Sequence, residues 1–439
     1  MIDRLLERAK KAGFTEAEAL LERGEQRRVK VFGGEVDEYA FSLTEGLGFR
    51  GLYEGKMGYA YTERMDDEGL EFLIQSAKTG ARLFSGADPE FLWRPEGDYP
   101  AVPGQKNIGT TAERSIADGL ALEQGVSSAG LKAESAVVGS GEGGVRLVNT
   151  LGLDESYQSH VGYAYVSALD EKDGETVSGG ESWEGESFDD FSVEALVREA
   201  VQDTLNKRGA RPCATGSWPV GFSNLAMVGL MQTFWGIFSA QAAQKGLSLL
   251  KGRLGERMAS PLVTLVDDPL LPGGLGNAPF DGEGVPTAKK TVVEKGVFTT
   301  FLHNLVTAKK DGVRTTGNAS RSAGSAKVGI SPFNLYVAPG ELTREEICGG
   351  MHEGLFVTEM MGHHAGANAI SGDFSLLAKG FWIKNGKIDH PVNQVTVAGN
   401  FYRLLQGVRG VGRDLRFDTG GASFGSPSLW VESLHVTGA

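Results

Sequence analysis

Residues 16–43, EAEALLERGEQRRVKVFGGEVDEYAFSL, predict a long β-hairpin near the start of the chain. One extended run ends at Val31, the pair Gly33-Gly34 follows, and a second extended run begins at Val36. Adjacent glycines between two such runs favour a tight turn, because glycine readily adopts the positive φ that hairpin turns need. A second hairpin is predicted around Glu54-Gly55. We therefore expect an antiparallel sheet in the first part of the chain.

Helical patterns flank these hairpins. The predicted helices cover residues 2–12, 66–81, 111–124 and 192–205. Residues 133–184 have a strand-like pattern instead, with apolar and polar residues alternating over much of their length. Helices, strands and helices in this order predict an N-terminal α+β domain with an antiparallel sheet over residues 1–214.

The second half, residues 215–439, is predicted to form a β-rich domain with antiparallel sheets. No charged residue occurs from Pro212 to Gln244, which predicts a long buried helix there. Polar residues and glycines interrupt this segment, so a core helix is favoured over a membrane span. Hairpin signals follow at Lys295-Gly296 and Asn385-Gly386. The predicted fold class is therefore α+β with two domains.

The composition excludes several classes of protein. The chain has 439 residues and a net charge of -13, which opposes binding to nucleic acid because that binding depends on Lys and Arg neutralising phosphates. Its two cysteines, Cys213 and Cys348, are too few for a disulfide framework. The N-terminus has no apolar run typical of a secretory signal. We expect a cytoplasmic protein with no membrane or nucleic-acid partner.

Residues 357–374, VTEMMGHHAGANAISGDF, concentrate the side chains that could perform chemistry. Glu359 is the candidate catalytic residue and His363 the candidate metal ligand, while His364 and Asp373 are candidates for contacts to a substrate. In a helix, His363 and the adjacent His364 would diverge by about 100°, but in a loop His363, His364 and Asp373 could converge. The segment thus looks like a hydrolytic metal site with a part missing.

A second acidic segment, Asp281-Gly282-Glu283-Gly284, could bind a hard cation through its carboxylates. It lacks the regular ligand spacing of a calcium loop, so we predict a turn with exposed acids.

Several blocks of sequence resemble the TldD/PmbA family. They are GEVDEYAF (34–41), GLGFRGLYEGKMGYAYT (46–62), FDGEGVPT (280–287), RTTGNASR (314–321), VTEMMGHHAGANAISGDFS (357–375) and FGSPSLWVESLHVTG (424–438). They extend over nearly the whole chain, in order. The resemblance implies a two-domain cytoplasmic protein of a family historically called modulators of DNA gyrase. It also implies that TldD and PmbA members, the latter also called TldE, pair to form a metallopeptidase acting on unfolded peptides.

The resemblance also implies which kind of subunit this is. TldD-type chains have a helical H-E-x-x-x-H, in which two histidines bind zinc and the glutamate activates water, and a cysteine near the C-terminus completes the site. The matching residues here are Thr358, Glu359 and His363, and no cysteine follows Cys348. Two of three expected ligands are missing. The stretch therefore resembles the remnant of a catalytic helix in a PmbA/TldE-type subunit.

Three functions remain open from the sequence. The first is a partner subunit without catalytic zinc or other cofactor, which joins a TldD-type subunit or a second copy of itself and helps to guide an unfolded peptide. The second is an active metallopeptidase that binds zinc through unusual ligands. The third is a regulatory binding protein without a role in proteolysis, as the gyrase-modulator name suggests.

Overall fold

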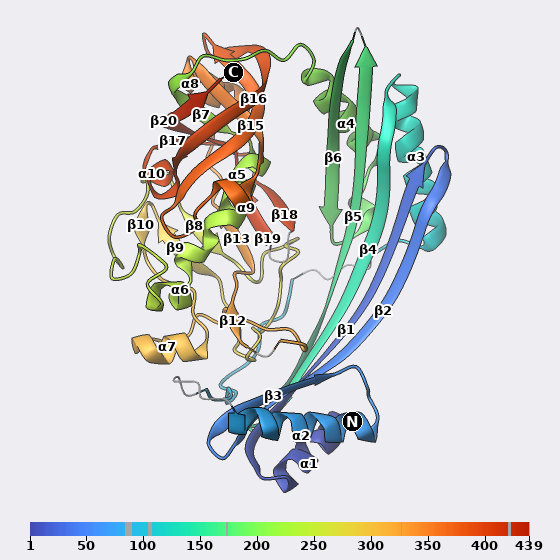
Figure 1. The fold of residues 1–439 in the computed structure, drawn as a ribbon, viewed down its shortest axis with the longest axis vertical. Helices are drawn as coiled ribbons and strands as arrows, with labels where there is room; N and C mark the ends of the chain where they lie inside the picture. Colours follow the sequence, from blue (N-terminus) through green and yellow to red (C-terminus); the bar gives the residue numbers. More distant parts are fainter. Residues whose placement is uncertain (84–89, 104–107, 173, 326, 420–422, 439) are drawn as a thin grey trace.

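The computed structural model describes residues 1–83, 90–103, 108–172, 174–325, 327–419 and 423–438. Within these residues the chain forms three six-stranded sheets and several helices (Figure 1). One sheet is in the N-terminal half and two are in the C-terminal half, which confirms the predicted α+β fold class. None of the helices described is long and apolar enough to cross a membrane.

The N-terminal sheet consists of long antiparallel hairpins in the order β3-β2-β1-β4-β5-β6. Both predicted hairpin turns are present, and φ is positive at Gly33, Gly34, Glu54 and Gly55. The strands are β1 (Phe14–Phe32), β2 (Glu35–Tyr53), β3 (Lys56–Thr62), β4 (Lys132–Asn149), β5 (Asp154–Lys172) and β6 (Glu175–Gly185).

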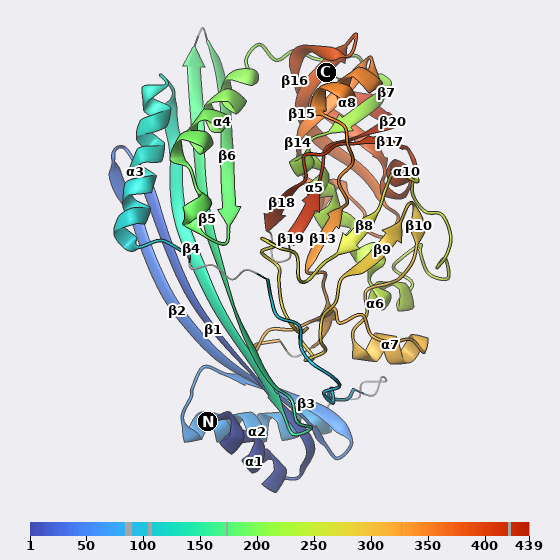
Figure 2. The same ribbon diagram turned by 180° about the vertical axis from the view of Figure 1, so that it is seen from behind.

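Four helices pack on one face of this sheet in two groups (Figures 1 and 2). At the base of the sheet, α1 (Ile2–Lys11) and α2 (Asp67–Leu83) share a core with Ala19 and Phe49. Toward the other end, α3 (Ala112–Ser128) and α4 (Val193–Asn206) share a second core with Val29 and Val166. The opposite face of the sheet is turned to the C-terminal half, where Leu20 packs in a cluster with Phe280.

The two C-terminal sheets are antiparallel except for one pair in each. The first has the order β10-β9-β8-β13-β19-β18 with β13 and β19 parallel, and the second has the order β16-β15-β14-β7-β20-β17 with β7 and β14 parallel. A further pairing of β16 with β20 closes the second sheet into a small barrel, which leaves few free edges. One large apolar core includes residues of both sheets.

The bounds of the C-terminal strands are β7 (Gly216–Phe222), β8 (Leu265–Asp267), β9 (Lys290–Glu294), β10 (Val297–Phe298), β11 (Ala319–Ser320), β12 (Gly329–Ile330), β13 (Asn334–Val337), β14 (Gly354–Met361), β15 (Asp373–Lys384), β16 (Lys387–Asn400), β17 (Val408–Val411), β18 (Arg416–Thr419), β19 (Ser423–Ser426) and β20 (Leu429–Thr437). The helices are α5 (Asn224–Phe234), α6 (Ala240–Gln244), α7 (Leu305–Asp311), α8 (Arg344–Met351), α9 (His363–Gly366) and α10 (Phe401–Gln406), with short 3₁₀ turns at Phe188–Asp190 and Trp235–Phe238. Both predicted hairpins, at Lys295-Gly296 and Asn385-Gly386, are present.

The prediction of a long buried helix from Pro212 to Gln244 is wrong at its start, where Gly216–Phe222 forms strand β7, and the helical remainder is buried but divided. It ends as α5 at Phe234, continues as a 3₁₀ turn, and restarts as α6 after Ser239. Ser239 has an extended backbone with φ of -77° and ψ of 124°, and it forms a bridge with Leu302. Tertiary pairing with this neighbouring segment therefore interrupts the helix that the uncharged sequence favours.

The two halves of the chain join through a buried ionic cluster, so the prediction of exposed acids at Asp281-Gly282-Glu283-Gly284 is wrong. Asp281 and Glu283 are 2% and 1% exposed. Arg50 lies 2.7 Å from Glu18 and 3.6 Å from Glu283, and Arg321 lies 2.9 Å from Glu18. We call these four residues, Glu18, Arg50, Glu283 and Arg321, the ionic joint. The acids are buried because arginines on distant segments compensate their charge.

Asp281 lies beside the ionic joint and organises the backbone around it. Its carboxylate accepts hydrogen bonds from the backbone N–H groups of Glu283, Val285 and Ala319. Burial, and after it the charge of Glu283, raise the pKa of Asp281 to about 7, although the three N–H donors oppose this shift. The side chain thereby ties the 280–287 and 314–321 blocks together.

Candidate functional site

A cleft of about 560 Å³ lies between the N-terminal sheet and the C-terminal half. One wall is formed by β5, β6 and α4, which face the C-terminal half in Figure 2, and the other by the start of α5 and by Thr358, Glu359 and Met360 of β14. His363 also lines this cleft. Two of the residues predicted from the sequence, Glu359 and His363, therefore face the same space.

Glu359 lies on a strand, and the prediction of a catalytic helix at this position is wrong. β14 is held between β7 and β15, and the strand continues to Met361. Gly362 then adopts a φ of 86°, and only His363–Gly366 forms a short helix. Pairing with β15 decides the conformation of residues 359–361, whereas β7 pairs only with residues 355–357.

A β-bulge gives Glu359 its direction. The register between β14 and β15 shifts between Val357 and Glu359, so Thr358 has no partner of its own in the ladder. Bulges of this kind re-aim the neighbouring side chains and are frequent beside functional sites. Ser223, which caps α5, donates a hydrogen bond to the Thr358 carbonyl at 3.2 Å and fixes the bulge against the helix.

The Glu359 carboxylate is paired with lysines. Lys379 Nζ lies 3.0 Å from Glu359 Oε2, and Lys207 Nζ lies 3.9 Å from the same oxygen. Lys207 follows α4 in the N-terminal half and is also 2.7 Å from Asp203. Glu359 thus takes part in an ion-pair network that crosses the cleft.

His363 is positioned by close packing and lacks a hydrogen bond at one ring nitrogen. Its Nε2 is buried without a partner in the structure described, and a Cβ added to Gly229 of α5 would lie 3.1 Å from this nitrogen. Burial lowers the pKa of His363, and the neighbouring His364 lowers it further. The imidazole is therefore held neutral near neutral pH.

His364 and Asp373 lie apart from the cleft walls. His364 is exposed, and it is absent from the cleft lining. Asp373 begins β15 and accepts a hydrogen bond from Asn400 at 2.8 Å. Hydrogen bonds from Asn400 and then from Ser371 lower the pKa of Asp373. The structure therefore brings Glu359 and His363 together at the cleft and leaves the other two candidates outside it.

The cleft residues do not fit a zinc ion. In the ranges described, no group of three or more His, Cys, Asp or Glu side chains is arranged so that it could hold a metal. Thr358 occupies the place where the family resemblance implies a histidine, and its hydroxyl donates to the Lys379 carbonyl. A catalytic zinc needs three protein ligands and an open position for water, and this donor set falls short of that.

Three basic residues of the cleft were not predicted from the sequence. Arg416 of β18 contacts the Glu181 carboxylate and donates to the Ser182 carbonyl at 2.9 Å, which connects β18 to β6. Lys207 and Lys379 pair with Glu359 as described above. Lys207 has a local partner in Asp203, but the acids that place the three cations at the cleft are at least 20 residues away, so no local motif marks them as cleft residues.

The outer edge of β6 faces the cleft and is occupied by acidic side chains. The N–H of Gly180 donates to Asp203 at 3.1 Å, and the N–H of Ser182 donates to Glu181 at 2.9 Å. β6 is the last strand of its sheet, and β18 is the last strand of the sheet opposite. Strand edges with backbone groups of this kind can pair with an extended chain.

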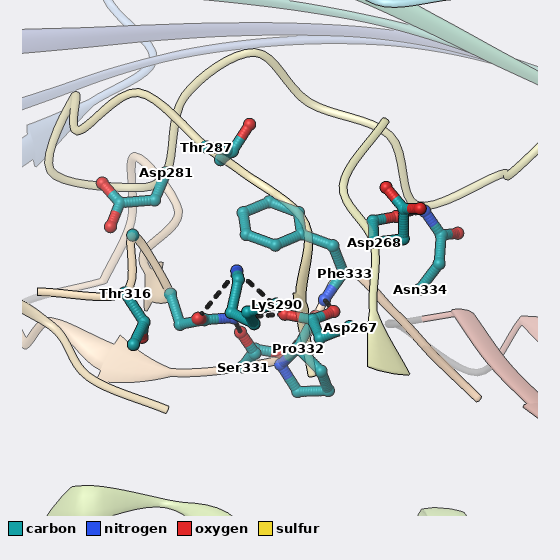
Figure 3. Close-up of polar contacts among 12 residues, drawn as sticks. Asp267, Asp268, Asp281, Thr287, Lys290, Thr316, Ser331, Pro332, Phe333 and Asn334 are labelled. Carbon is teal, nitrogen blue, oxygen red and sulfur yellow. Dashed lines mark hydrogen bonds and ion pairs between the residues drawn. The ribbon is translucent and has the colours of Figure 1, made fainter. Parts of the chain in front are cut away.

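A second polar cluster, shown in Figure 3, is fully paired within itself. Lys290 Nζ lies 3.2 Å from Asp267 Oδ2 and 3.0 Å from Asn318 Oδ1. Asn318 donates to Asp267 at 2.7 Å, and the Phe333 N–H donates to its other oxygen at 2.8 Å. With these bonds the buried Asp267 is satisfied, so we assign this cluster to stability of the C-terminal half.

Family models match three stretches of the chain. The model described as the PmbA/TldA metallopeptidase C-terminal domain matches residues 215–438, domain 1 matches residues 17–81, and the central domain matches residues 108–208. The chain belongs to the PmbA/TldD family. Two of the three stretches fall within residues 1–214, and the third begins at residue 215.

Relatives and solved structures agree with this family. The chain is 28% identical to the metalloprotease PmbA of Escherichia coli O157:H7 over 396 residues, which cover 87% of this chain and 84% of the relative. A Thermotoga maritima structure, described as a modulator of DNA gyrase, is 32% identical and superimposes with a TM-score of 0.91 over 99% of both chains. TldE of Thermococcus kodakarensis has the same fold, with a TM-score of 0.91 over 99% of both chains at 24% identity.

Proposed function

We propose that the chain is the PmbA/TldE-type subunit of a cytoplasmic TldD/TldE-type metallopeptidase that degrades unfolded peptides, and that it holds no catalytic zinc. The observation that carries this proposal is the pairing of Glu359 with Lys379 on a strand, together with the lack, among the described residues, of a group of three side chains around His363 that could hold a metal. A glutamate that activates a metal-bound water must reach that water, whereas this carboxylate is engaged by ammonium groups.

In the proposed role, the cleft forms one wall of the path by which a peptide reaches the zinc of a TldD-type partner. The edges of β6 and β18 approach the cleft from opposite sheets. An extended peptide can hydrogen-bond along such an edge without regard to its side chains, and this suits substrates that share only the lack of a fold. At the β6 edge, carboxylates accept hydrogen bonds from the backbone N–H groups, and the carbonyl groups of a bound peptide replace these carboxylates as acceptors.

The experiment combines metal analysis with an activity assay. The purified chain is analysed for zinc, and cleavage of an unfolded peptide is measured with and without a TldD-type subunit. We expect less than about 0.1 zinc per chain, no cleavage by the chain alone, and cleavage when the partner is added. Glu359→Ala should leave the activity of the pair within about threefold of the wild type, as should the control Glu353→Ala at an exposed position.

Two outcomes would contradict the proposal. Stoichiometric zinc, together with cleavage that is lost in Glu359→Ala but retained in Glu353→Ala, would show an active metallopeptidase with unusual ligands. No cleavage with any TldD-type subunit from the same organism, together with specific binding of a folded protein, would favour a regulatory binding protein instead.

A further inference from the structure

An ion pair occupies both backbone groups of Ser182 at the β6 edge. The N–H of Ser182 donates to Glu181 Oε1 at 2.9 Å, and Arg416 Nη2 donates to the Ser182 carbonyl at 2.9 Å. The same Arg416 nitrogen also contacts the same Glu181 oxygen. Glu181 and Arg416 thus bind each other and Ser182 at once, and we call these two residues the edge cap.

The capped backbone groups point away from the sheet. In an antiparallel strand the N–H and C=O of one residue point to the same side, and residues two apart share that side. The N–H of Gly180 donates to the Asp203 carboxylate and that of Ser182 to Glu181, so both residues face outward. Among the residues described, β6 pairs with β5 alone. Gly180 and Ser182 are therefore consecutive attachment points for an extended chain, and side chains occupy both.

The edge cap connects the two halves of the chain. Arg416 is the first residue of β18 and lies 235 positions from Glu181 in the sequence. Both views show β18 beside the C-terminal end of β6 (Figures 1 and 2). Glu181, Ser182 and Arg416 all line the cleft between the halves. A chain that enters the cleft along β6 therefore meets Arg416 at Ser182.

Displacement of the edge cap leaves no group without a partner. The Arg416 and Glu181 side chains are 31% and 17% exposed, and ion pairs that water reaches are weak and are screened by salt. A peptide carbonyl can replace Glu181 at the Ser182 N–H, and a peptide N–H can replace Arg416 at the Ser182 carbonyl. The two side chains can remain paired with each other as they leave, so neither charge is stranded.

We propose that the edge cap is autoinhibitory, with Arg416 as the residue that closes the β6 edge, and that an extended peptide binds there by displacing it. The inference rests on the proposed function, in which the peptide follows this edge. It gives Arg416 the opposite role from a cation that attracts a substrate. Loss of Arg416 therefore strengthens peptide binding, and so does salt, because salt weakens the competing ion pair.

The first measurement is the affinity of the purified full chain for an unstructured peptide, by fluorescence anisotropy. The probe has about ten Ser, Thr and Gly residues, blocked ends and an uncharged fluorophore, so that salt does not act on its charges. We expect the dissociation constant to be about three- to fivefold lower for Arg416→Met than for the wild type, and lower for Glu181→Gln as well. Between about 0.05 and 0.5 M NaCl it should fall about twofold for the wild type and stay constant for Arg416→Met.

The control Arg409→Met removes an exposed arginine that pairs with Glu432 inside the C-terminal half, and it should retain the wild-type affinity and salt response. Circular dichroism and the unfolding temperature verify that each variant is folded. Equal or weaker peptide binding by Arg416→Met would overturn the autoinhibition, and it would leave the proposed function standing as long as the wild type binds the peptide.

A second measurement, amide hydrogen exchange of residues 176–184 without peptide, tests the edge cap separately. Without Arg416, the Glu181 carboxylate loses its partner and can leave the Ser182 N–H, so exchange should be at least about threefold faster in Arg416→Met and unchanged in Arg409→Met. Unchanged exchange in Arg416→Met would overturn the inference. Faster exchange without peptide binding by any form would support the edge cap and contradict the proposed function.

Discussion

Replacement of Arg50 by Met should destabilise the chain more than any single change at an exposed ion pair. The Arg50 side chain is 1% exposed and bridges Glu18 at 2.7 Å and Glu283 at 3.6 Å. Glu18 keeps a second base, Arg321, at 2.9 Å, but Glu283 loses the only base that lies within 4 Å of it in the described ranges. Removing one partner of a buried pair costs about 3–5 kcal/mol, because the remaining charge is left uncompensated.

The assay is guanidinium unfolding followed by tryptophan fluorescence and circular dichroism. The control Arg64→Met removes an exposed arginine that pairs with Asp66 and Glu68, and it should cost less than about 1 kcal/mol. Arg50→Met/Glu283→Gln should recover about 1–3 kcal/mol of the Arg50→Met loss, because the stranded carboxylate is removed as well.

The reasoning would be refuted if Arg50→Met cost no more than Arg64→Met. It would also be refuted if Glu283→Gln added its own loss in the Arg50→Met background instead of recovering part of the stability. Either result would mean that the charges of the ionic joint are solvated or rearranged in solution.

Three further expectations concern other parts of the structure. Burial lowers the pKa of His303, so its contribution to the free energy of unfolding is fully present above about pH 6.5 and decreases as the pH falls below that value. His303→Gln should reduce this decrease in unfolding experiments at different pH, and equal pH slopes for variant and wild type would contradict it. Gly380→Ala places a Cβ 2.0 Å from the Phe356 carbonyl oxygen and should lower the free energy of unfolding by about 1–3 kcal/mol. The Cβ of Gly349→Ala in α8 meets nothing within 4 Å, so this variant should instead raise the free energy of unfolding by about 0.5–1 kcal/mol. A higher unfolding temperature for Gly380→Ala than for Gly349→Ala would contradict this packing. Ser223→Ala removes the α5 cap and should cost about 1 kcal/mol in urea unfolding, and a loss below about 0.3 kcal/mol would argue against the cap.

Local patterns predicted much of the N-terminal half. Gly33-Gly34 and Glu54-Gly55 mark turns through their own conformational preferences, and the helices near 66–81 and 192–205 follow from apolar spacing within one segment. These features depend on residues close in the sequence. They could therefore be predicted without knowledge of the rest of the chain.

Features that depend on residues distant in the sequence were either not predicted or predicted wrongly. Asp281 and Glu283 have the composition of an exposed turn, and only Arg50 and Arg321, from other segments, make their burial possible. Glu359 was expected on a helix through family resemblance, but its pairing with Lys379 of β15 makes it part of strand β14. The network of Lys207, Lys379 and Glu359 likewise joins three separate elements, and neither lysine has a local signal for its contact with Glu359.

The strand order of the small barrel has a consequence for synthesis of the protein. β7 is the first strand of the C-terminal half, yet it lies between β14 and β20, and β20 ends at Thr437. While the chain is being translated, one side of β7 has no partner strand until β20 has left the ribosome. Because chains are made from the N-terminus at only about 5–20 residues per second, the apolar β7 and α5 remain exposed for many seconds. The nascent chain is therefore prone to aggregate through these apolar elements until β20 has been synthesised.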